Sequence, residues 1–213
     1  MTSGDYIILL VFVVLAPLLI MAQLYLLGLK LSEPEKMIKP LPNGPNAQTQ
    51  DRLLQHKDWL ASVNLQYRTA FQFGPMQVLV FQQGDAPRFM VFNSHNRLTY
   101  AAESYTPELN VLDTSASRSI GLMPRPGAYA QAFPSASPAE IWERHLAGEA
   151  HLSAKFGCQW RPLNLAYEDI LIDAAKLRMK YVRAQSLWPA RVMYRFFVTR
   201  HRLVNRTIAQ QFP

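Results

Sequence analysis

Cysteine is almost absent from this chain: Cys158 is the one thiol among 213 residues. A single thiol excludes an intrachain disulfide, and the composition is compatible with a reducing compartment. A lone cysteine cannot build a thiol-rich metal site, and it is more often a small buried apolar residue than a nucleophile. We therefore expect no structural disulfide and assign no catalytic role to this thiol.

Glycine is also scarce, and none of the nine glycines forms a Walker A loop or a dinucleotide-binding turn. No paired-carboxylate motif is present. The cluster of His145, Glu149 and His151 invites a metal interpretation, but it has neither the HExxH spacing nor thiol partners. The sequence therefore predicts no cofactor and no metal site.

A nucleophile triad can be assembled on paper from Asp113, His145 and either Ser115 or Ser117. Neither serine lies in a G-x-S-x-G elbow, although the members of a triad need not be close in sequence. Because no catalytic template is met, we predict that the protein is not an enzyme and name no catalytic residue.

Acidic residues are missing from the last forty positions. All fifteen lie at or before Asp173, together with thirteen Lys and Arg, whereas residues 174–213 hold nine basic residues and no acid. The formal net charge of +7 is therefore a local excess on an otherwise nearly neutral chain. A basic tail of this kind predicts contact with an anionic surface or partner.

One long stretch carries no charge at all. Residues 6–29 form a nearly continuous apolar run, and about 20 apolar residues suffice to cross a hydrocarbon core of ~30 Å. The run is too long for a secretory signal peptide and no Lys or Arg precedes it, so we predict an uncleaved transmembrane helix. Lys30, Lys36 and Lys39 follow it, which by the positive-inside rule predicts a cytoplasmic C-terminal domain.

The chain divides into four predicted parts. Residues 1–31 form the anchor, residues 32–50 a Pro-rich linker, residues 51–165 an α+β domain and residues 166–213 a basic helical tail. In the α+β domain, short apolar runs separated by turn residues predict an antiparallel meander of four or five strands. The expected strands are 67–73, 78–81, 89–92, 98–103 and 109–114, and their aromatic residues are expected to pack in the core.

A helix is predicted to cover one face of this sheet. Ser137, Pro138 and Glu140 supply an N-cap, a first-turn proline and the N3 residue of a capping box, and Gly157 marks the end. Before this helix, residues 115–136 form a loop rich in Ser, Pro and Gly. A loop of this length is often functional.

The basic tail is expected to hold two helices, from Tyr167 to about Ser186 and from Pro189 to about Gln210. Projection of the second at about 100° per residue gathers arginines on one face and apolar residues on the other. Such a helix can lie on anionic lipid, bind nucleic-acid phosphates or pack on the domain as an ordinary surface helix. The residues predicted to contact a membrane or a partner are Trp188, Arg191, Arg195, Phe196, Phe197, Arg202 and Arg206.

These features predict a single-pass membrane-anchored, non-enzymatic accessory or assembly component of a larger membrane protein complex. Its expected partners are the lipid bilayer, including anionic lipid, and a membrane protein. An alternative is a membrane-tethered enzyme or small-ligand-binding domain that uses residues 115–136 with the sheet. A deep pocket holding His145, Cys158 or Asp113 with a strongly shifted pKa would favour that alternative. A tethered nucleic-acid binder is the third and least favoured interpretation.

Overall fold

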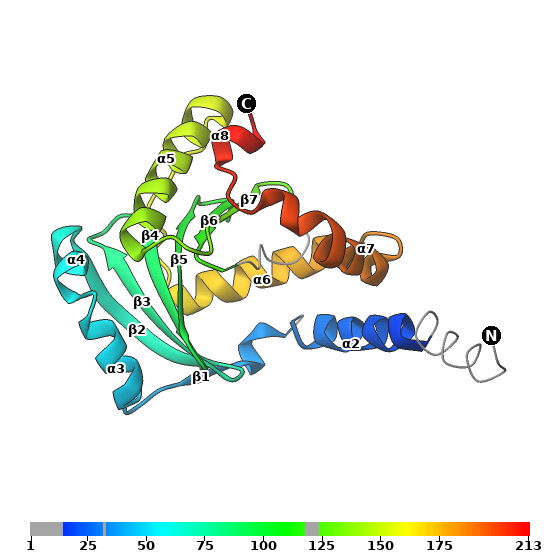
Figure 1. Ribbon diagram of the computed structural model, residues 1–213, viewed down its shortest axis with the longest axis horizontal. Coiled ribbons are helices and arrows are strands. Elements are labelled where there is room, and N and C mark those ends of the chain that lie inside the picture. Colours follow the sequence, from blue (N-terminus) through cyan, green and yellow to red (C-terminus); the bar gives the residue numbers. More distant parts are fainter. Residues whose placement is uncertain (1–14, 32, 118–123) are drawn as a thin grey trace.

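The computed structural model of the protein describes residues 15–31, 33–117 and 124–213. The chain runs from an N-terminal helix through a sheet to a helical C-terminal segment (Figure 1). The strands are β1 (Ile38–Pro40), β2 (Leu65–Phe73), β3 (Met76–Gln83), β4 (Arg88–Ser94), β5 (Leu98–Tyr105), β6 (Val111–Ser115) and β7 (Ala128–Ala132). The helices are α2 (Ala16–Leu31), α3 (Ala47–Leu54), α4 (Lys57–Ser62), α5 (Pro138–Phe156), α6 (Tyr167–Arg183), α7 (Trp188–Tyr194) and α8 (Ile208–Gln211). Shorter helical turns are η2 (Pro34–Lys36), η3 (Arg195–Thr199) and η4 (Arg200–Leu203).

The strands form one seven-stranded mixed sheet in the order β1-β2-β3-β4-β5-β6-β7. Neighbours pair antiparallel from β1 to β6, whereas β6 and β7 pair in parallel. The predicted antiparallel sheet of four or five strands is therefore wrong in strand number and in direction. Strands β2 to β6 correspond to the five predicted runs, and residues 116–127 supply the longer connection that a parallel pair requires.

The two additional strands lack a local sequence signal. β1 ends at Pro40, which cannot donate a ladder hydrogen bond and is tolerated because β1 is an edge strand. β7 has the sequence AYAQA, and alanine has low β-propensity. Its position is held from both sides, by pairing with β6 and by the C-terminal segment, where the Asn205 N–H donates to the Ala132 carbonyl at 2.8 Å.

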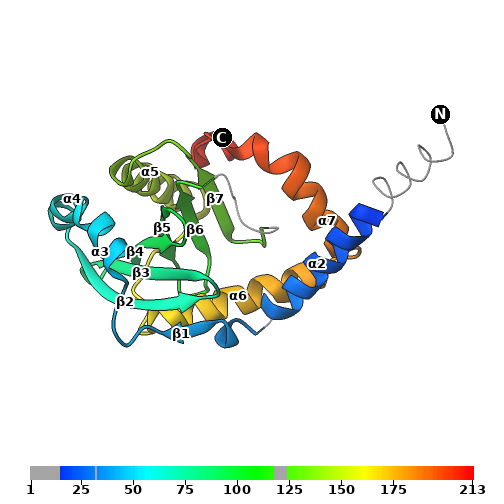
Figure 2. The ribbon, with the colours of Figure 1, turned by 60° about the horizontal axis from the view of Figure 1, so that its bottom comes forward.

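Both faces of the sheet are covered, as Figure 2 shows. On one face, Leu79, Met90 and Phe92 pack with residues of α4 and α5; we call it the α5 face. On the opposite face, Val80 and Val91 pack with residues of α6; we call it the α6 face. Because both faces are buried, the sequences of the central strands are continuous apolar runs and do not alternate between apolar and polar residues.

Helix α5 begins and ends where its sequence signals predict. Ser137 Oγ accepts a hydrogen bond from the Glu140 N–H at 3.3 Å, and Glu140 Oε2 accepts one from the Ser137 N–H at 2.7 Å. Gly157 ends the helix with a φ of 66°, in the left-handed region that glycine adopts at little cost. The predicted capping box and C-cap are confirmed.

The apolar N-terminal run does not provide a membrane span in the described residues. α2 has 16 residues, which makes about 24 Å of helix against a hydrocarbon core of ~30 Å. No helix within residues 15–31, 33–117 and 124–213 is long and apolar enough to cross a membrane. The prediction of a single-pass membrane protein with a cytoplasmic C-terminal domain is therefore wrong. Residues 6–14 of the predicted run lie outside the described residues.

The C-terminal segment also differs from the predicted pair of long helices. α6 follows the prediction, but the second helix is interrupted, because α7 passes into the π turn η3 and the 3₁₀ turn η4. The chain then extends at Val204, which forms a parallel bridge with Ala132. The Ile208 N–H donates to Gln131 Oε1 at 2.9 Å, so the chain end returns to β7 and α5. The predicted row of arginines therefore does not lie along one continuous helix.

Candidate functional site

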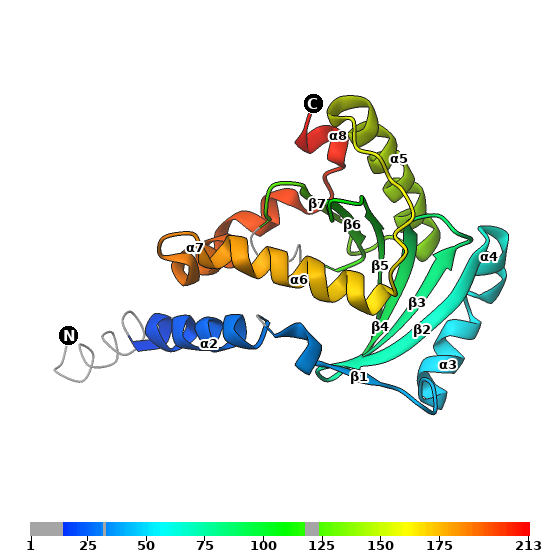
Figure 3. The ribbon, with the colours of Figure 1, turned by 180° about the vertical axis from the view of Figure 1, so that it is seen from behind.

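Helices α2, α6 and α7 and the turn η3 form a projection at one end of the molecule, which we call the arm (Figures 2 and 3). α2 contacts both α6 and α7. Tyr25 of α2 stacks on Trp188 of α7 with ring centroids 5.9 Å apart, and Lys176 of α6 pairs with Glu35 of η2 at 3.3 Å. Trp188, one of the predicted contact residues, thus has a partner within the arm.

The arm carries most of the large apolar side chains that stay exposed in the described residues. They are Leu15, Leu18, Leu19, Tyr25, Leu26, Leu177, Leu187, Tyr194, Phe197 and Val198. Leu187, in the turn between α6 and α7, is the most exposed at 77%. Its φ of 52° lies in the left-handed region, which residues other than glycine rarely adopt. Grouped exposed apolar side chains of this kind mark interaction surfaces.

The basic residues predicted as contacts are spread along the C-terminal segment. The predicted contact residues lie in α7 (Trp188, Arg191), η3 (Arg195, Phe196, Phe197), η4 (Arg202) and the turn before α8 (Arg206). Arg195 and Arg206 both line a cavity of about 260 Å³ beside β7 and α8. Arg195 Nε is buried without a hydrogen-bond partner among the described residues, and burial lowers the pKa of its guanidinium. Of the four predicted arginines, the structure brings these two to a common cavity.

His145 lies in a buried polar network on the α5 face. Its Nε2 is 2.8 Å from Ser104 Oγ and its Nδ1 is 3.0 Å from Thr114 Oγ1, so both ring nitrogens have hydroxyl partners. Ser104 also donates to Glu149, which pairs with Arg88 at 2.7 Å. Burial would raise the pKa of the Glu149 carboxyl, but hydrogen bonds and charge from its partners, led by His145, hold it below its usual value. The network ties α5 to β4, β5 and β6.

This arrangement does not provide a metal site in the chain as described. His151, the third member of the predicted cluster, points elsewhere, with its Nε2 2.7 Å from the Phe212 carbonyl. No group of three His, Cys, Asp or Glu side chains within the described ranges could hold a metal ion. His145 and Glu149 therefore connect elements of the fold.

The residues of the candidate nucleophile triad are also separated in the structure. Asp113 and Ser115 belong to β6 on the α6 face, because they alternate with Thr114, whose hydroxyl meets His145 on the α5 face. The sheet itself thus stands between Asp113 and His145. The geometry does not provide a Ser-His-Asp relay from these residues.

On the α6 face, β5 and β6 bring two carboxyl groups together. Glu103 lies opposite Asp113, and Glu103 Oε2 accepts hydrogen bonds from the hydroxyls of Tyr105 at 2.6 Å and Tyr167 at 2.8 Å. Asp113 Oδ1 is buried without a hydrogen-bond partner among the described residues. Burial and the neighbouring Glu103 charge raise the pKa of Asp113 to about 7, against an opposing effect of Arg178. The sequence alone does not indicate that these two carboxylates are neighbours, because the distance between them depends on the register of β5 and β6.

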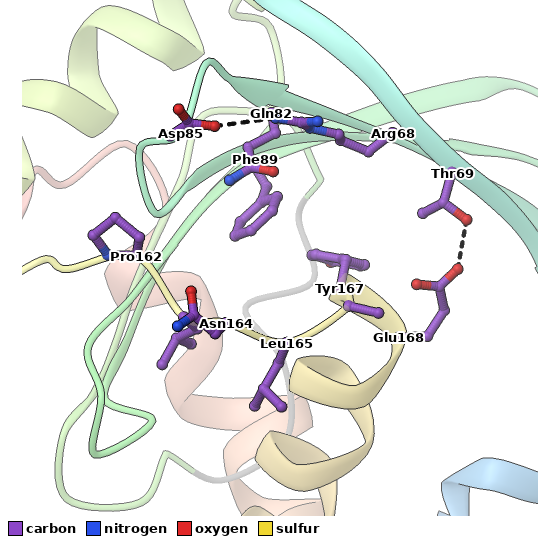
Figure 4. A pocket seen from close by; sticks show the side chains of 12 residues that line it. Arg68, Thr69, Gln82, Asp85, Phe89, Pro162, Asn164, Leu165, Tyr167 and Glu168 are labelled. Atoms are coloured by element: carbon purple, nitrogen blue, oxygen red, sulfur yellow. Dashed lines mark hydrogen bonds and ion pairs between the residues drawn. The ribbon is translucent and has the colours of Figure 1, made fainter.

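A cavity of about 430 Å³ opens at the N-terminal end of α6 (Figure 4). Its aromatic wall is formed by Phe89 of β4 and Tyr167 of α6, whose ring centroids are 5.0 Å apart. Charged residues line it too: Arg68 of β2, Asp85 of the turn between β3 and β4, and Glu168 of α6. Tyr167 connects the two features, because its ring lines the cavity while its hydroxyl donates to Glu103.

Sequence reasoning missed this cavity. Phe89 packs in the core, as the sequence predicts, and it also lines the cavity, whereas Phe71 and Phe92 are fully buried. Arg68 and Glu168 are a hundred positions apart, and no local pattern links them. Comparison of the chain with known protein families, with curated proteins and with solved structures finds no match.

Proposed function

We propose that this protein is a non-enzymatic accessory or assembly component, and that its arm docks an acidic partner protein. The observation that carries the proposal is Leu187, an apolar side chain that is 77% exposed at φ 52° in the α6–α7 turn. A left-handed leucine costs about 1–2 kcal/mol relative to glycine. Strain of this kind clusters at functional sites.

The other exposed side chains of the arm support the same function. Leu18, Leu19 and Leu26 on α2 are each more than half exposed, and so is Tyr194 on α7. Covering one such leucine completely contributes about 1.5–3 kcal/mol, and less here because each is already partly covered. An interface needs only a few apolar or aromatic anchors of this size.

Charge indicates the kind of partner. Residues 174–213 hold nine basic residues and no acid, and this stretch supplies most of α6, α7 and η3. A partner with acidic residues around an apolar helix would match the arm in both respects and would be steered toward it. Two copies of the arm would instead bring like charges together, which disfavours self-association through this surface.

Two observations favour a protein over a lipid surface. Trp188 stacks on Tyr25, so this aromatic residue is engaged in packing the arm. The arginines do not follow one helix face: Arg191 donates to Gln185 Oε1, while Arg195 and Arg206 line a cavity beside β7. Interfacial helices, in contrast, present one continuous apolar face with cations along its borders.

Site-specific photocrosslinking of the full chain tests the proposal. A photoreactive phenylalanine analogue would replace Leu187 in one protein and Leu54 in another. Leu54, on α3, is the matched control, because it is 64% exposed and lies outside the arm. The captured protein would then be identified, purified and recombined with the unmodified chain.

The expected result is one partner captured from position 187 and not from position 54. After purification, it should form a stable complex through an acidic surface, and the complex should weaken as salt is added. Crosslinks only to a second copy of this chain would contradict the proposal. So would flotation of the chain with anionic liposomes in the absence of any reconstituted protein complex.

A further inference from the structure

The cavity beside β7 and α8 brings together two arginines without a counterion, and we call it the arginine cavity. Arg195 of η3 and Arg206 of the turn before α8 both line it. No acidic side chain lines this cavity, and residues 174–213 contain no acid. Neither guanidinium forms an ion pair with any residue that the structure describes. Like charges that share a cavity repel each other, and a bound anion would relieve this repulsion.

The environment of Arg195 increases the cost of leaving this charge without a counterion. Its Nε is buried and has no hydrogen-bond partner among the described residues. Burial lowers the pKa of the guanidinium, but an arginine remains charged at neutral pH. Because a buried charge is unfavourable unless it is paired, Arg195 should favour a ligand that brings negative charge into the cavity.

The wall that carries Arg206 is held in place by other hydrogen bonds. Gln211 Nε2 donates to the Ala130 carbonyl of β7 and to the Arg206 carbonyl, both at 3.1 Å. The Thr207 N–H donates to Gln210 Oε1 at 2.9 Å. This bond leaves the Gln210 Nε2 donor without a partner in the described part of the chain, and Gln210 also lines the cavity. A wall that is already ordered lowers the entropic cost of binding.

We propose that the arginine cavity binds the phosphate group of a compact, water-soluble phosphate monoester. Such a group carries about −1.5 to −2 charge at neutral pH and has three acceptor oxygens, which match two guanidinium groups and one amide donor. The partly exposed side chains of Tyr129, Leu203 and Phe212 also line the cavity and can contact the organic part of the ligand. The volume of about 260 Å³ limits the ligand to a small molecule.

The surroundings of the cavity favour a soluble ligand over a lipid headgroup. A lipid phosphate is reached by a protein surface that also places apolar side chains in the bilayer. The large apolar side chains that are exposed in the described residues include none on β7, η4 or α8, the elements around Arg206. The phosphate monoester is therefore expected to come from solution.

This site goes beyond the proposed docking function and does not depend on it. None of the exposed apolar side chains of the arm lines the arginine cavity. Leu187→Gly should therefore bind the phosphate monoester with wild-type affinity, and ligand binding is measured with no partner protein present. Failure of one proposal can thus be distinguished from failure of the other.

Calorimetric titration of the full chain with phenyl phosphate tests the assignment. Three further probes change one property each: phenyl sulfate keeps the shape but carries one charge, phenol lacks the anionic group and inorganic phosphate lacks the ring. Arg195→Gln and Arg206→Gln each remove one guanidinium. Arg202→Gln is the matched control, because Arg202 is an exposed arginine of the same segment that does not line the cavity.

Phenyl phosphate should bind in the micromolar to millimolar range, and each of the other three probes should bind about tenfold more weakly or not at all. Arg195→Gln and Arg206→Gln should each weaken binding about tenfold, while Arg202→Gln keeps wild-type affinity. Arg206 is exposed, so its variant is expected to fold, and wild-type affinity in Arg206→Gln would overturn the assignment.

Two results with the wild-type chain would also overturn the assignment, whether or not the variants fold. One is the absence of heat with millimolar phenyl phosphate, and the other is equal affinity for phenyl phosphate and phenyl sulfate. Flotation of the chain with vesicles of phosphatidylcholine and phosphatidic acid, abolished by phenyl phosphate, would overturn the assignment of a soluble ligand.

Discussion

Glu103 lies directly opposite Asp113 across the β5–β6 ladder, so two carboxyl groups share the face of the sheet that α6 covers. Glu103 is satisfied by two tyrosine hydroxyls, whereas Asp113 Oδ1 is buried without a partner among the described residues. Both cannot carry a charge at this distance without cost, and the pKa of Asp113 rises to about 7.

This pKa shift predicts how stability depends on pH. The folded chain keeps a proton on Asp113 that the unfolded chain releases above its ordinary pKa of 3.8. Its contribution to the free energy of unfolding is therefore complete at low pH and is lost as pH rises toward about 7. Asp113→Asn cannot ionise, so its free energy of unfolding should exceed that of the wild type by about 1–3 kcal/mol near pH 8.

Urea denaturation near pH 5 and near pH 8 measures the effect. Asp169→Asn, on the exposed side of α6, is the control and should follow the wild type at both values. If Asp113→Asn were less stable than the wild type at the higher pH, Asp113 would be a paired carboxylate and this description of the face would be wrong.

The network on the α5 face predicts the opposite response to loss of a charge. Glu149→Gln leaves Arg88 without its anion and disturbs the contacts of Ser104 and His145. The free energy of unfolding should fall by about 2–4 kcal/mol. Since the pKa of Glu149 is lowered in the folded chain, this stabilisation is present above its ordinary pKa and is lost as pH falls below it.

Glu143→Gln makes the same substitution on the exposed side of the same helix, and its effect should stay within about 0.5 kcal/mol. Thermal or urea unfolding at neutral pH compares the two variants directly. Equal effects would show that the charge of Glu149 has no structural importance.

Gly127 lies directly before β7, at the start of the parallel pairing between β6 and β7. Its φ is 76°, its carbonyl accepts from the Val111 N–H at 2.9 Å, and a Cβ here would overlap the side chain of Asn110. Gly44 has a similar φ of 68° but open space around the Cβ position. Gly127→Ala should therefore destabilise the protein by about 1 kcal/mol more than Gly44→Ala, which carries the backbone cost alone. Equal unfolding midpoints for the two variants would contradict the contact.

Local sequence signals predicted the parts of the fold that depend on near neighbours. The capping box at Ser137 and the turn residues between β2 and β6 act within a few positions, and the structure has them as expected. β7 depends on partners far away in sequence, such as Val204, and its own residues have low β-propensity. The apolar run predicts a membrane span, whereas the described α2 is too short for one and packs on α6 and α7.

The candidate sites depended even more on distant contacts. Register places Glu103 beside Asp113, and a bulge turns Arg68 into the cavity that Glu168 lines from α6. Neither relation can be found from spacing along one chain. The strained φ of Leu187 likewise follows from the path of the chain between α6 and α7. Glycine and asparagine are the usual sequence signals of a left-handed residue, and neither occurs in this turn.

The affinity of the purified partner for Leu187→Gly tests the central claim, that the arm docks a protein, most directly. Glycine removes the exposed side chain and relieves the left-handed strain, so the free energy of unfolding should stay equal or rise by about 1 kcal/mol. Binding measured by calorimetry should weaken about tenfold or more, while Leu54→Ala keeps wild-type affinity. Wild-type affinity in Leu187→Gly, with a folded protein, would contradict docking at the arm.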